Sequence, residues 1–110
     1  MERLTTNHAL LRLSQAAGKE FISLFRHGSL EIEIYKPHLV DRKKPHTRDE
    51  IYVVISGSGY FVNGPDRTPF QPGEVLFVSA GIVHRFEEFT SDFSTWVFFY
   101  GPEGGETHTD

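Results

Sequence analysis

Short segments separated by glycine and proline constrain the fold of this chain more than any other feature of its sequence. Its ten glycines and six prolines fall largely between stretches that are apolar or alternate between apolar and polar residues. Many short strands at nearly even spacing, with turns of this kind between them, are typical of antiparallel sandwiches and barrels. The sequence therefore predicts an all-β fold, with strands near residues 21–25, 30–35, 51–56, 60–62, 75–78, 83–87 and 95–100.

One short helix is expected before the first strand. Thr6 or Asn7 is a suitable N-cap, and Gly18 ends the helix after Ala17. Its apolar side carries Leu10, Leu11 and Leu13. No further helix is expected.

The length of 110 residues fits one domain and leaves no room for a second core. We expect an N-terminal helical segment over residues 1–20, a β-barrel over 21–101 and a frayed polar tail over 102–110. A domain of this size buries a modest core, so dimerisation is a natural way to cover more apolar surface.

Charge and composition exclude several classes of function. The net charge is −4, and the one basic run, Arg42-Lys43-Lys44, has acidic neighbours, which argues against nucleic acid as a partner. The chain has no cysteine, so thiol catalysis, disulfides and thiolate metal sites are excluded. There is no apolar run long enough for a membrane span and no signal-peptide pattern. The expectation is a soluble cytoplasmic protein without a membrane partner.

A metal site in a chain without cysteine needs histidine and carboxylate ligands, so the six histidines are informative. His46 lies in the pattern Pro45-His-Thr-Arg-Asp-Glu50, which leads into a strand and then Gly57. His84 ends a pattern that runs from Gly73 through a strand. The other histidines are expected at ordinary surface or loop positions, namely His8, His27, His38 and His108.

These two patterns, in this order, resemble the two motifs of the cupin superfamily. His46 and Glu50 fall on the second histidine and the glutamate of the first motif, and His84 falls on the histidine of the second. Three positions depart from the family pattern. They are Lys44 in place of the first histidine, Ser79 in place of the turn proline and Glu88 in place of the final asparagine.

The resemblance implies a fold and a cofactor. The fold is an antiparallel double-stranded β-helix, or jelly-roll barrel, which often forms homodimers. The cofactor is one divalent metal ion held by His46, Glu50 and His84. Two imidazoles and one carboxylate suit Fe, Mn, Ni or Zn and leave positions open for water and substrate.

The spacing of two of these ligands makes a structural demand. On a straight strand His46 and Glu50 would lie roughly 13 Å apart, at about 3.3 Å per residue. Ligands of one ion must each approach it to about 2.0–2.2 Å. The segment Thr47-Arg48-Asp49 must therefore bend the chain.

A pocket with aromatic walls is expected beside these ligands. Alternation along the strands places Tyr52 on the face of Glu50, and Phe86 and Glu88 on the face of His84. Trp96 and Phe98 are expected to complete the substrate-binding walls. Tyr52 and Glu88 are the candidates for proton transfer.

The favoured function is that of a small metal-dependent cupin, acting on a small organic molecule as a dioxygenase or as an isomerase or lyase. The alternative is a non-catalytic small-ligand-binding or sensor cupin with a degenerate metal site. Lys44 makes the alternative realistic, because a charged lysine has no lone pair for a metal. A purely structural dimer with a vestigial pocket ranks third. His38, Asp41 and Asp49 stay open as replacements for the missing ligand.

Overall fold

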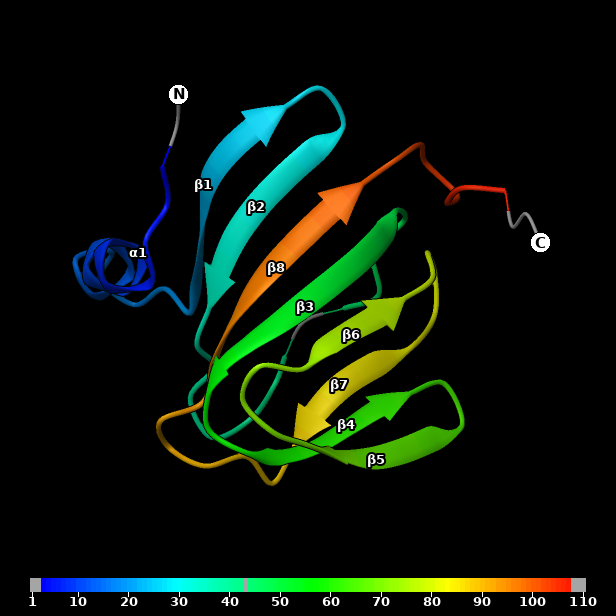
Figure 1. Cartoon of the computed structure of the whole chain (residues 1–110). Helices are drawn as coiled ribbons and strands as arrows, with labels where there is room; N and C mark the ends of the chain where they lie inside the picture. Colours follow the sequence, from blue (N-terminus) through cyan, green and yellow to red (C-terminus); the bar gives the residue numbers. More distant parts are fainter. Residues whose placement is uncertain (1–2, 43, 108–110) are drawn as a thin grey trace.

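The computed structural model describes residues 3–42 and 44–107 (Figure 1). A short helix precedes eight strands. The elements are α1 (Thr6–Ser14), β1 (Phe21–His27), β2 (Leu30–Tyr35), β3 (Asp49–Ser56), β4 (Gly59–Asn63), β5 (Asp66–Phe70), β6 (Val75–Val78), β7 (His84–Glu87) and β8 (Ser94–Tyr100).

The strands form two sheets in which all pairings are antiparallel. The larger sheet has the order β1-β2-β8-β3-β6, and the smaller has the order β5-β4-β7. The two sheets face each other across the interior (Figure 1). The predicted all-β jelly-roll barrel with a short N-terminal helix is confirmed.

Aromatic side chains fill the space between the sheets. The ring of Phe86 lies 4.6–5.2 Å, centroid to centroid, from the rings of Tyr52, Phe61, Phe70 and Phe93. All five side chains are buried. Because a fully buried large apolar side chain contributes roughly 1.5–3 kcal/mol, this ring cluster is a main source of stability.

Helix α1 packs on the outer face of the larger sheet, not inside the barrel. Its buried residues Ala9 and Leu13 lie in one cluster with Ile34 and Trp96. The N-cap is Thr5, which precedes both predicted candidates, Thr6 and Asn7, and its side chain accepts a hydrogen bond from the backbone of His8.

The helix also ends earlier than predicted. It stops at Ser14, not at Ala17. The Ser14 hydroxyl donates to the Leu11 carbonyl at 2.6 Å, and such a bond competes with the next turn of helix. Among the described residues this is the sole α-helix, and no helix there is long and apolar enough to cross a membrane. The cytoplasmic location stays a prediction.

The structure differs from the sequence prediction at two further places. Strand β5 was not predicted, because its sequence is polar and contains Pro69. It is an edge strand, where proline is tolerated since one side needs no ladder bond. The tail is not frayed over residues 102–107. There the backbone N–H of Gly104 donates to the Thr47 carbonyl at 2.6 Å.

The outer face of the larger sheet carries two cross-strand rows of apolar side chains. Residues paired in register form the rows Ile32-Phe98-Ile51-Phe77 and Ile34-Trp96-Val53-Val75. Helix α1 covers part of the second row. Phe77 and Val75 are 48% and 66% exposed, and neither row contains a charge.

The homodimer predicted from the sequence would bury this face. The exposed side chains of Phe77 and Val75 would be covered there, and an uncharged face meets no like-charge repulsion from an identical face. We therefore expect Phe77→Asp to convert a dimer to a monomer in size-exclusion chromatography with light scattering. Leu39→Asp, in an exposed loop, is the control. A wild-type protein that is monomeric at every concentration tested would contradict this prediction.

Candidate functional site

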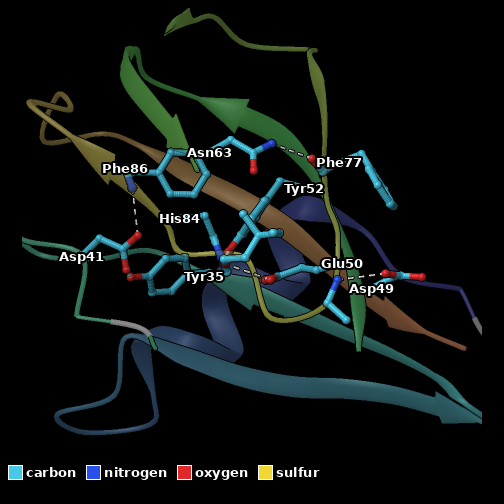
Figure 2. A network of polar contacts seen from close by, with 11 residues as sticks. Tyr35, Asp41, Asp49, Glu50, Tyr52, Asn63, Phe77, His84 and Phe86 are labelled. Atoms are coloured by element: carbon cyan, nitrogen blue, oxygen red, sulfur yellow. Dashed lines mark hydrogen bonds and ion pairs between the residues drawn. The ribbon is translucent and has the colours of Figure 1, made fainter. Parts of the chain in front are cut away.

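Three polar side chains from opposite sheets meet inside the barrel. Glu50 and Tyr52 project from β3 and His84 begins β7 (Figure 2). The Nε2 atom of His84 lies 3.0 Å from Oε1 of Glu50 and 3.1 Å from the Tyr52 hydroxyl. All three residues are at most 4% exposed. The alternation that predicted Glu50 and Tyr52 on one face is confirmed.

The second ring nitrogen of His84 fixes the orientation of the imidazole. Its Nδ1 lies 2.8 Å from the carbonyl oxygen of Ile82, so Nδ1 is the donor in that bond. Nδ1 therefore keeps its proton in both forms of His84. Nε2 carries the lone pair when His84 is neutral, and it donates a proton toward Glu50 when His84 is charged. Metal-binding histidines typically have this arrangement, with the other ring N–H donated to a carbonyl or carboxylate.

The electrostatics of the site follow from burial and from Glu50. Burial lowers the pKa of His84, but the hydrogen bonds to Glu50 and the Ile82 carbonyl outweigh it and raise the pKa above its usual value. Burial, then the charge of Glu50 and a hydrogen bond to it, raises the pKa of Tyr52 well above its usual value. The Tyr52 hydroxyl therefore keeps its proton and acts as a donor.

His46 lies next to these groups but does not converge with them. The bend predicted at Thr47-Arg48-Asp49 is present, since residues 47 and 48 form a bend and β3 begins at Asp49. The centroid of the His46 ring lies 6.5 Å from that of the His84 ring. The His46 ring packs against Phe99, with centroids 4.4 Å apart. Within residues 3–42 and 44–107, no three histidine, aspartate or glutamate side chains are already arranged to hold an ion.

The candidates for a further ligand occupy different places. Asp49 lies on the other face of β3 from Glu50, where its Oδ1 accepts the N–H of Ala80 at 3.0 Å. His38 and Lys44 are exposed. Asp41 is the one that approaches the interior. The other residues of interest, Lys43 and His108, lie outside the described residues.

Asp41 joins two parts of the barrel near the site. Its Oδ1 accepts the hydroxyl proton of Tyr35 at 2.5 Å, and its Oδ2 accepts the backbone N–H of Phe86 at 2.9 Å (Figure 2). Tyr35 was not among the residues predicted for the site. The available signal was its position at the end of an alternating strand, on the face opposite Ile32 and Ile34.

The predicted pocket walls are only partly brought together. Phe86 contacts Tyr52 inside the barrel, as predicted. Trp96 packs instead with α1 on the outer face, and Phe98 shares that face, so the structure does not bring them to the site. Val97 and Phe99 occupy the inward positions of β8, and both are buried.

Glu88 is also not at the site. Strand β7 ends at Glu87, and Glu88 has a φ of +49°, so the alternation that would point it inward is broken. Its side chain is 72% exposed and pairs with Arg67. The prediction that Glu88 lies beside His84 for proton transfer is wrong in its geometry, and Tyr52 is the candidate donor that the structure brings to His84.

The site thus combines a carboxylate, an oriented imidazole and a protonated phenol in an apolar, aromatic interior. Such groups can bind a polar atom of a small molecule and exchange a proton with it. The carboxylate and the imidazole are also donor types suited to a divalent first-row metal.

Comparisons with known proteins agree with this architecture. The profile of the family described as "Cupin domain" matches residues 31–99. An uncharacterized protein of Streptomyces coelicolor is 31% identical over 85 residues, which cover 76% of this chain and 81% of that protein.

Solved structures show the same fold. A cupin 2 conserved barrel domain protein from Salinispora arenicola has a TM-score of 0.65 and 20% identity, over 92% of this chain and 89% of its own. A chain from a study of the DMSP lyases RdDddP and RnDddQII has a TM-score of 0.63 and 24% identity, over 76% of this chain and 47% of its own. This chain is a member of the cupin domain family.

Proposed function

We propose that this protein binds one divalent metal ion through Glu50, His84 and His46, and that a small organic molecule binds beside the ion inside the barrel. The observation that carries the proposal is the 3.0 Å separation of His84 Nε2 and Glu50 Oε1. Two ligand atoms that each lie about 2.0–2.2 Å from one ion, at right angles to each other, are about 3 Å apart.

His46 is proposed as the third ligand because of its place in the sequence motif and in the barrel. It occupies the second histidine of the first motif, and its ring packs against Phe99 beside His84. Its ring centroid lies 6.5 Å from that of His84. The metal site therefore rests first on the Glu50–His84 pair, and His46 is expected to strengthen it.

The chemistry proposed for the site follows from its residues. A bound divalent metal would supply Lewis-acid polarisation of a substrate oxygen or, as iron, reactivity toward dioxygen. The Tyr52 hydroxyl, kept protonated by burial, would donate a hydrogen bond or a proton to a ligand oxygen. The apolar rings of Phe61 and Phe86, whose centroids lie 5.8 and 4.9 Å from that of Tyr52, would exclude water there. Dioxygenase and isomerase or lyase reactions on small carbonyl, enol or carboxylate compounds fit these groups.

The second candidate is a non-catalytic cupin that binds a small ligand without metal. The observation that favours it is that the described residues contain no three histidine or carboxylate side chains arranged to hold an ion, while the His46 ring packs against Phe99. In this alternative the His84–Glu50 pair would bind the polar group of the ligand directly. The similarity to the chain from the DMSP lyase study reports on the fold, and one fold hosts many functions.

The role of His46 is tested by comparing two histidine variants. We expect His46→Ala to weaken Mn²⁺ binding about 10-fold or more, measured by equilibrium dialysis, because one ligand is lost. His38→Ala is the matched control, since His38 is an exposed loop residue. Equal affinities in the two variants would remove His46 from the site. Mn²⁺-independent binding of small molecules by the wild type, with no Mn²⁺ binding, would favour the second candidate.

A further inference from the structure

The segment after β8 is bonded to the bend that precedes β3. The backbone N–H of Gly104 donates to the Thr47 carbonyl at 2.6 Å, and that of Gly81 donates to the His46 carbonyl at 2.7 Å. The bend that carries His46 and leads to Glu50 is thus held by two other segments, residues 79–81 and 101–107. Figure 1 shows the chain after β8 extending past the end of the larger sheet.

Asp49 joins these three segments through its side chain. Oδ1 accepts the N–H of Ala80 at 3.0 Å, and Oδ2 accepts the N–H of Glu106 at 2.8 Å. Asp49 is only 5% exposed. A buried carboxylate is costly unless it is hydrogen-bonded, and each of its two oxygens has a backbone donor here. The carboxylate therefore fixes where Ala80 and Glu106 lie relative to β3.

The fit of the segment against Asp49 is close. Gly105 has a φ of +91°, and a Cβ atom built on it would lie 2.9 Å from Asp49 Oδ1 and 3.1 Å from the Ala80 Cβ. A side chain fits at this position only if the Asp49 carboxylate shifts from its present position or the segment moves away. Gly104 has a similar φ of +86°, but a Cβ there would meet nothing within 4 Å.

We propose that Asp49 is a positioning residue for the candidate site, and that residues 101–107 are a strap that Asp49 holds against the bend. Asp49 is adjacent to Glu50 but faces the other side of β3. By fixing the bend it sets the direction of the Glu50 carboxylate and the distance of the His46 ring from His84. The proposal rests on the proposed metal site, because it assigns Asp49 a role in the geometry of those ligands.

A purely structural role of Asp49 would lead to a different experimental result. If Asp49 only anchored the end of the chain, displacing the strap would lower the free energy of unfolding but leave the affinity of the folded protein for a metal unchanged. A positioning role requires that the affinity fall while the protein stays folded. Functional groups misplaced by a fraction of an ångström lose much of their effect.

The test uses Gly105→Ala, which crowds the contact between the strap and the Asp49 carboxylate, and Gly104→Ala, which has similar backbone strain without that contact. We expect Gly105→Ala to bind Mn²⁺ about 10-fold more weakly than Gly104→Ala by equilibrium dialysis, the size of effect seen when an outer-shell partner is lost. Asp49→Asn is the second variant, because its amide places an NH₂ group against a backbone donor. It is expected to weaken Mn²⁺ binding to a similar extent. Urea unfolding establishes that each variant is folded.

The possible results distinguish a failure of the positioning role of Asp49 from a failure of the proposed metal site. Equal Mn²⁺ affinity of wild type, Gly105→Ala and Asp49→Asn would overturn the positioning role while leaving the site intact. A wild type that binds no Mn²⁺ would instead contradict the metal site. In that case amide hydrogen exchange over residues 46–50 tests the strap alone. Faster exchange in Gly105→Ala than in Gly104→Ala would support it, and equal exchange would overturn it.

Discussion

Replacing His84 with alanine is expected to lower the affinity of this protein for a divalent metal ion by at least about 100-fold. Loss of an outer-shell partner alone costs about 10–100-fold, and this change removes a ligand and leaves Glu50 as the one proposed ligand already in place. The ring is oriented by its 2.8 Å bond to the Ile82 carbonyl and lies 3.0 Å from Glu50. Isothermal titration with Mn²⁺ or Zn²⁺ measures the change.

The control for this prediction is His27→Ala, at the exposed end of β1. It removes an imidazole of the same kind from the surface and is expected to leave the affinity unchanged. Glu50→Gln keeps the shape of the side chain, removes its charge, and is expected to behave like His84→Ala. Full affinity in both site variants would show that the metal binds elsewhere.

Replacing Gly57 with alanine is expected to destabilise the fold by about 3 kcal/mol or more. Gly57 has a φ of +85°, and an added Cβ would lie 2.5 Å from the Cα of Phe93, which is itself fully buried. A left-handed conformation costs about 1–2 kcal/mol for a residue with a Cβ, and overpacking adds about 1–3 kcal/mol. Because the contact is with backbone, no side-chain rotation relieves it.

Gly73→Ala separates these two contributions. Gly73 has a φ of +87°, and an added Cβ would meet nothing within 4 Å. We expect a loss of only about 1–2 kcal/mol, from the backbone conformation alone. Urea unfolding of both variants gives the difference. Equal losses would mean that the close approach of Gly57 to Phe93 does not constrain the barrel.

The sequence predicted the parts of this structure that local patterns determine. The two motifs identified Glu50 and His84, which the fold brings to 3.0 Å from opposite sheets. Alternation along β3 placed Tyr52 beside Glu50, and glycine and proline spacing gave the all-β barrel. In each case one short segment contains the information.

The faces of β8 could not be assigned in this way. Its sequence is apolar at every position from Trp96 to Phe99, so alternation alone does not say which set faces the barrel. The register with β3 decides it, because Val97 pairs with Tyr52 and both lie in the barrel core. Trp96 therefore faces α1, and that packing is not encoded in β8 itself.

Long-range hydrogen bonds explain the remaining differences. Nothing near residues 102–107 in the sequence indicates order, but Asp49, some 57 positions from Glu106, accepts its N–H. Asp41 likewise meets Phe86, 45 positions away. Glu88 departs from alternation because its positive φ ends β7, a conformation that its residue type does not predict.

The most direct test of the proposed metal site is elemental analysis of the purified wild-type protein beside His84→Ala, after incubation with Fe(II), Mn(II), Ni(II) and Zn(II) in turn and removal of unbound ion. The proposal predicts about one metal ion per chain in the wild type for at least one of these metals, and none in His84→Ala. No bound metal in the wild type under any of these conditions would contradict the metal site, and so would the same metal content in both proteins.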